Sequence, residues 1–193
     1  MINNIMIVGV GGQGTLLASK ILGRLFVDRG YDVRVSEVHG MSQRGGSVVT
    51  YVRRGERVAS PLICEGEADL ILAFEELEAA RYLPYLKTGG IVIASRQRIE
   101  PAVVLTGASV YPPDIGDRVK KSGAILYEID ALEAAIEAGS PKAVNLVLLG
   151  VLSRLLPEIE PASWTKVIEQ TVPPRFLEIN ERAFAAGRNM AIG

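Results

Sequence analysis

One stretch near the start of the sequence has residues that could bind an anionic group. The letters GVGGQG follow a short apolar run and precede a helical pattern, and they match the motif G-x-G-x-x-G. Glycines let a backbone turn tightly and approach a ligand, and the first N–H groups and the dipole of the next helix favour negative charge. The candidate cofactor-binding residues in this stretch are Gly9, Gly11, Gly12, Gln13 and Gly14.

The glycine motif allows two interpretations. Glu37 ends the next predicted strand, roughly 20 residues beyond the glycines, where a dinucleotide-binding fold keeps an acid for the ribose. This position supports NAD binding, but the chain then enters a loop and another strand instead of the second crossover helix of such a fold. In the alternative interpretation, the glycines only close a tight turn between a strand and a helix.

The loop that follows Glu37 carries a second group of candidates, in the letters HGMSQRGG. Its histidine, the only one in the chain, could donate a hydrogen bond or move a proton. Its arginine could hold a carboxylate or a phosphate through two parallel hydrogen bonds. The alternatives are a structural donor for the histidine and an interface ion pair for the arginine. We name His39 and Arg44 as candidate catalytic residues, and as further cofactor-binding candidates Ser42, Gln43, Gly45 and Gly46.

These candidates need secondary-structure elements that bring them together. Runs rich in β-branched residues at 4–10 and 32–38, on either side of a helical pattern that stops at Gly30, predict a strand–helix–strand unit. Such a unit implies a parallel pair of strands joined by a right-handed crossover. Residues 47–60 also have strand character, and Arg54-Gly55-Glu56 is expected to form a hairpin turn within them.

The rest of the chain predicts an alternation of strands and helices, followed by a helical region. Further strands are expected at 68–74 and 91–95, with 101–105 and 124–130 as additional candidates, a helix at 75–87 that is stopped by Gly89 and Gly90, and a short helix within 111–123. Prolines separate four helices at 131–138, 142–155, 162–171 and 175–186. We predict an α/β fold: a Rossmann-like, mostly parallel sheet flanked by helices, with a helical C-terminal region. It forms one domain over 1–193, with a sheet core at 1–130 and a helical part at 131–193.

Composition excludes several classes of protein. The formal net charge of −1 provides no field that would attract nucleic acid or an anionic membrane. The most apolar stretch, 143–152, is too short to span a membrane, and the start of the chain lacks the pattern of a signal peptide. The single cysteine, Cys64, cannot form an internal disulfide or ligate an iron–sulfur cluster alone. A low cysteine content suits the cytoplasm, which is the expected location.

The two N-terminal motifs, taken together, resemble a known family. The stretches MIVGVGGQGTLLASKILG and SEVHGMSQRGGSVVTYVR are similar to the beta subunit of indolepyruvate:ferredoxin oxidoreductases, and more broadly to the gamma domain of the 2-oxoacid:ferredoxin oxidoreductases. The resemblance continues through ADLILAFEELEAARYLPYLKTGG and KAVNLVLLGVL to PPRFLEINERAFAAG, so that it covers nearly the whole chain.

This resemblance implies a subunit of an enzyme. The family oxidatively decarboxylates 2-oxoacids, joins the acyl group to coenzyme A and passes electrons to ferredoxin. A large alpha subunit would hold thiamine diphosphate, magnesium and iron–sulfur clusters, whereas the present chain would hold none of them and would be inactive alone. The loop at 39–46 would close over the partner's site and supply backbone N–H donors and a cation. Two alternatives stay open: a free-standing NAD(P)- or coenzyme A-binding module, and a non-catalytic interaction subunit.

Overall fold

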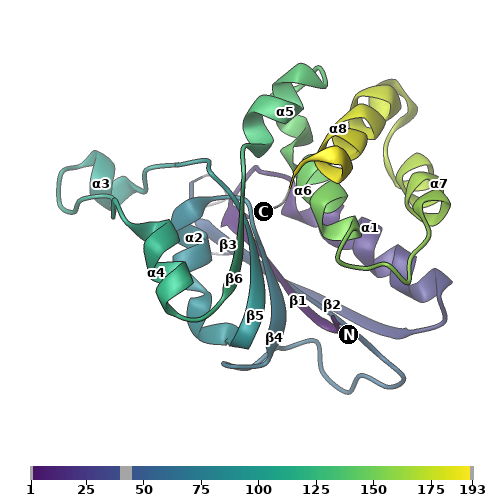
Figure 1. Cartoon of the computed structure of the whole chain (residues 1–193), viewed down its shortest axis with the longest axis horizontal. Helices are drawn as coiled ribbons and strands as arrows, with labels where there is room; N and C mark the ends of the chain where they lie inside the picture. The colour runs from purple at the N-terminus through teal and green to yellow at the C-terminus, as the bar shows by residue number, and fades with distance from the viewer. Residues whose placement is uncertain (1, 40–44, 192–193) are drawn as a thin grey trace.

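The computed structural model describes residues 2–39 and 45–191, and six strands within these ranges form one sheet. The strands are β1 (Asn4–Val10), β2 (Asp32–His39), β3 (Ser47–Gly55), β4 (Ala68–Ala73), β5 (Leu86–Ser95) and β6 (Ile125–Ile129). Their order across the sheet is β2-β3-β1-β4-β5-β6 (Figure 1). β3 runs antiparallel to both of its neighbours, whereas β1, β4, β5 and β6 pair in parallel.

Both faces of this sheet are buried in its central strands. Along β1, Ile5 and Ile7 point into one hydrophobic core, and Met6 and Val8 point into another on the opposite face. All four side chains are fully buried. Burial on two faces explains why the sequence of β1 is a continuous apolar run and not an alternation of apolar and polar residues.

Helices cover the two faces of the sheet unequally, as Figure 1 shows. α1 (Thr15–Asp28) packs on the face of Ile5, whereas α2 (Glu76–Arg81) and α4 (Ile115–Lys121) pack on the face of Met6. The four C-terminal helices join the core of α1: α5 (Ala131–Glu137), α6 (Val144–Ser153), α7 (Pro161–Thr171) and α8 (Leu177–Asn189). The sheet and the C-terminal helices thus share a core, and the single domain over 1–193 stays a prediction. Among the described helices, none has both the length and the apolar character needed to cross a membrane.

Two glycines allow α6 and α8 to cross at very short range. Every residue of α6 is buried. A Cβ atom placed on Gly150 would lie 2.2 Å from the backbone oxygen of Phe184, and one placed on Gly187 would lie 1.9 Å from the backbone oxygen of Val147. Each helix therefore packs its backbone directly against the other, which requires residues without a side chain at both positions.

The predicted α/β class is confirmed, but the predicted pairing of the first two strands is wrong. β1 and β2 are not neighbours, because β3 lies between them and hydrogen-bonds to both. The predicted hairpin at 54–56 is also wrong. β3 ends at Gly55, and the N–H of Val58 donates to Asp32 Oδ2 at 2.8 Å, which directs the chain into a loop instead of a returning strand.

Residues 101–105 are not the predicted additional strand. They include the short helix α3 (Ala102–Leu105), which follows Pro101. β5 and β6 pair directly with each other along Ile91–Ser95 and Ile125–Ile129, so the sheet has no position for a strand between them. Apolar, β-branched composition alone could not distinguish these two outcomes.

The predicted helix at 75–87 is shorter than expected. α2 ends at Arg81 and is followed by a 3₁₀ turn at Leu83–Tyr85, in which Pro84 lacks the N–H that a continuing helix requires. Gly89 and Gly90 do not stop a helix but lie inside β5. There the pairing with β4 changes register, and Gly89 has a φ of +71°, as expected for an irregularity in a strand.

Candidate functional site

The glycine turn lies at the carboxyl end of β1, near the middle of the sheet. Gly12 and Gly14 have φ angles of +102° and +87°, in the left-handed region that favours glycine, and Gly14 is the N-cap of α1. The N–H of Gly11 donates to the backbone oxygen of Gly46 at 2.9 Å. The structure therefore brings together the two motifs that the sequence singled out, because the turn after β1 is bonded to the residues just before β3.

The side chain of Gln13 holds this turn in place. Its Oε1 accepts from the N–H of Val10 at 2.7 Å. Its Nε2 donates to the backbone oxygen of Phe74 at 2.9 Å and to Gln97 Oε1 at 3.0 Å. Both amide hydrogens are thus used within the protein, so Gln13 positions the glycine turn against the ends of β4 and β5.

Close packing supports the turn on two sides. A Cβ atom on Gly9 would lie 2.8 Å from Gln13 Oε1, and one on Gly14 would lie 2.7 Å from Asn145 Nδ2. Asn145 is buried at the start of α6, and its Nδ2 donates to the backbone oxygen of Gly14 at 3.4 Å. By contrast, a Cβ atom on Gly12 would meet nothing within 4 Å. Gly12 therefore faces open space, unlike Gly9 and Gly14.

Two pockets lie on either side of Gly12. One, of about 400 Å³, is lined by Glu37 of β2, Val48 of β3 and residues of the glycine turn. The other, of about 330 Å³, is lined by Gln97, Lys142 and residues of the same turn. Gly12 and Gly14 belong to both. The turn thus separates a pocket with an acid from a pocket with a basic side chain, as would suit a ligand that carries both a hydroxyl group and an anionic group.

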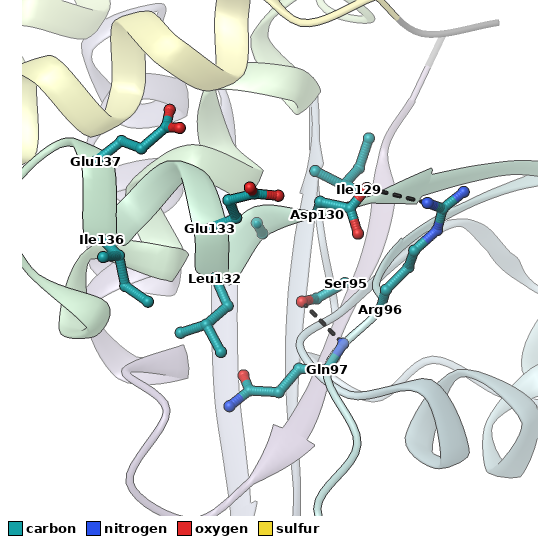
Figure 2. Close-up of a pocket in the computed structure, with 10 residues that line it drawn as sticks. Ser95, Arg96, Gln97, Ile129, Asp130, Leu132, Glu133, Ile136 and Glu137 are labelled. Atoms are coloured by element: carbon teal, nitrogen blue, oxygen red, sulfur yellow. Dashed lines mark hydrogen bonds and ion pairs between the residues drawn. The ribbon is translucent and has the colours of Figure 1, made fainter.

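A larger hollow of about 520 Å³ continues along the same edge of the sheet, beyond β5 (Figure 2). In Figure 2, Ser95 is the last residue of β5 and Gln97 follows the strand, while Leu132 and Ile136 line the hollow from α5. Asp130 Oδ2 accepts from Arg96 Nη1 at 3.0 Å across its rim. The hollow lies at the carboxyl ends of parallel strands, which is where open α/β sheets bind their ligands.

Two acids at the start of α2 form a buried polar network. The carboxylate of Glu75 accepts from the N–H of Glu78 at 2.9 Å, so Glu75 is the N-cap of α2. It also accepts from the hydroxyl of Tyr111 at 2.5 Å, and burial together with this carboxylate raises the pKa of Tyr111 well above its ordinary value. Glu78 in turn accepts from the hydroxyl of Ser47, which ties α2 to the first residue of β3.

Several of the candidates lie in or beside the loop before β3. Ser42, Gln43 and Arg44 are outside the described residues. His39 is the last residue of β2 and pairs with Val48 of β3. Gly45 has a φ of +76°, and Gly46 accepts the bond from Gly11. The roles assigned to these residues stay predictions.

Sequence reasoning missed three residues that line or support the site, namely Gln97, Lys142 and Asn145. Gln97 comes two residues after a strand predicted at 91–95, and the rule that ligands bind beyond the carboxyl ends of strands could have indicated it. Lys142 lies in the 3₁₀ turn before α6 and Asn145 lies in α6, both distant in sequence from the glycine turn, and no local pattern points to them. Among the described residues, no group of three or more His, Cys, Asp or Glu side chains could hold a metal ion.

We expect Gly14→Ala to destabilise the protein more than Gly12→Ala. Both substitutions place a side chain on a left-handed backbone, which costs about 1 kcal/mol each. Only at Gly14 would the added methyl group displace Asn145, and this should cost a further ~1–2 kcal/mol. Urea unfolding followed by circular dichroism measures the difference. Equal losses in the two variants would show that the contact with Asn145 does not hold the turn.

Comparisons with known proteins place the chain in a family. Residues 4–190 match the family model described as "Pyruvate ferredoxin/flavodoxin oxidoreductase". The chain is 46% identical over 191 residues to "Indolepyruvate oxidoreductase subunit IorB" of Thermococcus kodakarensis, with 95% of this chain and 93% of that protein covered. It is 45% identical over 189 residues to the protein of the same name from Pyrococcus horikoshii, with the same coverage of both chains.

The fold agrees with that of a solved structure. The gamma subunit of a keto/oxoacid ferredoxin oxidoreductase from Geobacter sulfurreducens superimposes with a TM-score of 0.71, over 96% of this chain and 95% of that one, at 23% identity. At this identity the likeness establishes the fold only. Family membership is established by the match of the family model over nearly the whole chain and by the identity to the two relatives. The chain belongs to the pyruvate ferredoxin/flavodoxin oxidoreductase family, as a homologue of the small subunits of indolepyruvate oxidoreductases.

Proposed function

We propose that this chain is the small subunit of a cytoplasmic 2-oxoacid:ferredoxin oxidoreductase of the indolepyruvate type. The names of the two relatives support the aryl-pyruvate substrate class. In the proposed complex a larger alpha subunit binds thiamine diphosphate, magnesium and iron–sulfur clusters, and passes electrons to ferredoxin. The thiamine group would supply the carbanion chemistry that removes carbon dioxide from the 2-oxoacid. The present chain would be inactive without that subunit.

The observation that carries this proposal is the arrangement at the carboxyl edge of the sheet. Gly12 faces open space between a pocket with Glu37 and a pocket with Lys142, and the N–H of Gly11 in the same turn donates to the backbone oxygen of Gly46, just before β3. Backbone N–H groups and a cation at one edge suit a phosphate or a carboxylate. We propose that this edge faces the partner's reaction site, that the Lys142 pocket receives a phosphate group of coenzyme A, and that the loop helps to exclude water.

Reconstitution tests the assignment as a subunit. The full-length chain is mixed with the large subunit from the same organism, and reduction of a viologen dye is followed with indolepyruvate and coenzyme A. We expect activity from the mixture and none from this chain alone. Dye reduction by the isolated chain, or an intact complex that is inactive with every 2-oxoacid tried, would contradict the proposal.

Arg44→Ala should lower the activity of the reconstituted complex by about 10- to 100-fold, which is the scale of one lost charge-assisted interaction. Assembly should be unchanged, since a loop contact with a substrate or cofactor does not carry the subunit interface. Arg57→Ala is the matched control, because Arg57 is an exposed arginine that lies beyond the opposite end of β3. If Arg44→Ala and Arg57→Ala give the same rates, Arg44 takes no part in the reaction.

A second candidate function is a nucleotide-binding module that acts without a partner. The observation in its favour is that Glu37 and the glycine turn line the same pocket. Isothermal titration calorimetry of the isolated chain with NAD, NADP and coenzyme A distinguishes the two functions. Saturable NAD(P) binding that is lost in Glu37→Gln would favour the module. If none of the three ligands binds and the complex is inactive, a structural or regulatory interaction subunit becomes the better description.

A further inference from the structure

An exposed apolar arm projects from the body of the protein between β5 and α4. This arm comprises residues 101–113, includes the short helix α3, and extends away from the sheet (Figure 1). It contains no charged residue, although 22% of the chain is charged. Its large aliphatic side chains point into solvent: Val103 is 56% exposed, Leu105 70% and Val110 83%. Three such side chains on one short projection form the kind of surface that a soluble protein covers with a partner.

A single buried carboxylate fixes both ends of this arm. Glu75 Oε1 accepts from the N–H of Ile99, just before the arm, at 3.1 Å, and from the hydroxyl of Tyr111, near its end, at 2.5 Å. The guanidinium of Arg98 lies 5.5 Å from the centre of the Tyr111 ring and also bonds to Glu76 at 2.7 Å. The base of the arm is therefore held in place before any partner arrives, which lowers the entropic cost of docking.

The charge distribution indicates what can cover the arm. Four pockets along the carboxyl edge of the sheet all contain charged side chains: Glu37 in one, Lys142 in two, and Arg96, Asp130, Glu133 and Glu137 in the hollow beyond β5. Aliphatic side chains inserted there would strip water from those charges without providing a hydrogen bond, which is unfavourable. These four pockets of a second copy would therefore not receive the arm. An uncharged, apolar groove on a different protein would match the arm.

The arm also begins beside the candidate site. Gln97, two residues before Ile99, bonds to Gln13 of the glycine turn. A protein seated on the arm would therefore lie over the same edge of the sheet as the glycine turn and its two pockets. We propose that residues 101–113 are a docking arm, whose aliphatic side chains Val103, Leu105 and Val110 enter an uncharged groove of the large subunit. The identity of that partner rests on the proposed function.

Titration of the large subunit with variants of the full-length chain tests the arm. Leu105→Asp and Val110→Asp should each raise the Kd for the large subunit by about 30-fold or more, which is the scale of a central interface residue. Leu105→Met, which keeps an apolar side chain, should bind like the wild type. Val27→Asp is the matched control: Val27 is 55% exposed on α1, away from the arm, and its variant should also bind normally. Sedimentation velocity gives both the Kd and the oligomeric state of the isolated chain.

The outcomes separate this inference from the proposed function. Because Leu105 and Val110 are exposed, their variants should melt within about 2 °C of the wild type, so that a loss of binding is not a loss of folding. Wild-type affinity in both aspartate variants would overturn the docking arm, even if the complex is an active oxidoreductase. A dimer of the isolated chain that Leu105→Asp dissociates would overturn it in favour of a second copy. Tight binding that depends on the arm, in a complex without oxidoreductase activity, would overturn only the proposed function.

Discussion

Gly187→Ala should lower the free energy of unfolding by about 3 kcal/mol or more, because the added methyl group has no space. Its carbon would lie 1.9 Å from the backbone oxygen of Val147 and 2.7 Å from the carbonyl carbon of the same residue. Both are backbone atoms of α6, so no rotation of a side chain can relieve the contact, and α8 must move as a whole. We expect a large decrease in the midpoint of urea unfolding, or failure to accumulate folded protein.

The position within the interface, and not the loss of a helical glycine, should cause this effect. Gly23→Ala is the matched control, because its methyl group would only make an ordinary contact of 3.5 Å with Val35. Alanine is a better helix former than glycine, so Gly23→Ala should stabilise the protein by about 0.5–1 kcal/mol. Gly150→Ala, whose methyl group would lie 2.2 Å from the oxygen of Phe184, should behave like Gly187→Ala. A wild-type midpoint in both interface variants would mean that the two helices do not cross as described.

Arg54→Ala should lower the free energy of unfolding by about 3 kcal/mol, since it removes a charged group that several elements share. The Arg54 side chain is fully buried and forms an ion pair with Glu158, in the segment before α7. Its Nε donates to the backbone oxygen of Ile2 at 2.8 Å, and its guanidinium lies 4.4 Å from the centre of the Phe26 ring. Arg24→Ala is the control, because the pair of Arg24 with Asp28 is exposed and should contribute less than about 0.5 kcal/mol.

The same ion pair predicts how stability depends on pH. Burial alone would raise the pKa of Glu158, but the hydrogen bond and the charge of Arg54 outweigh it and lower that pKa below its ordinary value of 4.5. A lowered carboxyl pKa contributes stability that is present above the ordinary value and is lost as the pH falls through the lowered one. The difference in stability between the wild type and Arg54→Ala should therefore shrink on acidification below about pH 4.5. A difference that stays constant down to pH 2 would contradict this account of Glu158.

Local patterns in the sequence identified most elements of the fold. The glycine turn, the strand that precedes it and the helices of the last third follow from hydrophobic period and from glycine and proline positions. The position of β3 between β1 and β2 does not follow from local patterns, because the apolar pattern of a strand does not say which other strands pair with it. In the same way, 101–105 has the composition of a strand, and only the direct pairing of β5 with β6 excludes it from the sheet.

Some residues of the candidate site could be predicted from the sequence, and others could not. The glycines of the turn were predictable, since each stands in a motif with a known backbone requirement. Gln13 was also identified, although its bonds to Phe74 and Gln97 make it a support of the turn. Lys142 and Asn145 were not predictable, because they reach the turn from a segment at the start of α6 that is more than a hundred residues away in the chain. Contacts of this kind depend on tertiary packing, which no local window of sequence contains.

The complete burial of α6 has a consequence for synthesis of the protein. All six strands and the helices through α7 leave the ribosome before α8, yet α8 is the helix whose backbone covers Gly150. Until α8 emerges, the nascent chain presents an apolar helix with one side uncovered, which is a surface that chaperones bind and that promotes aggregation. Folding of the whole sheet-and-helix core is therefore completed late, and a nonsense mutation before Leu177 would yield an insoluble product and not a shortened subunit.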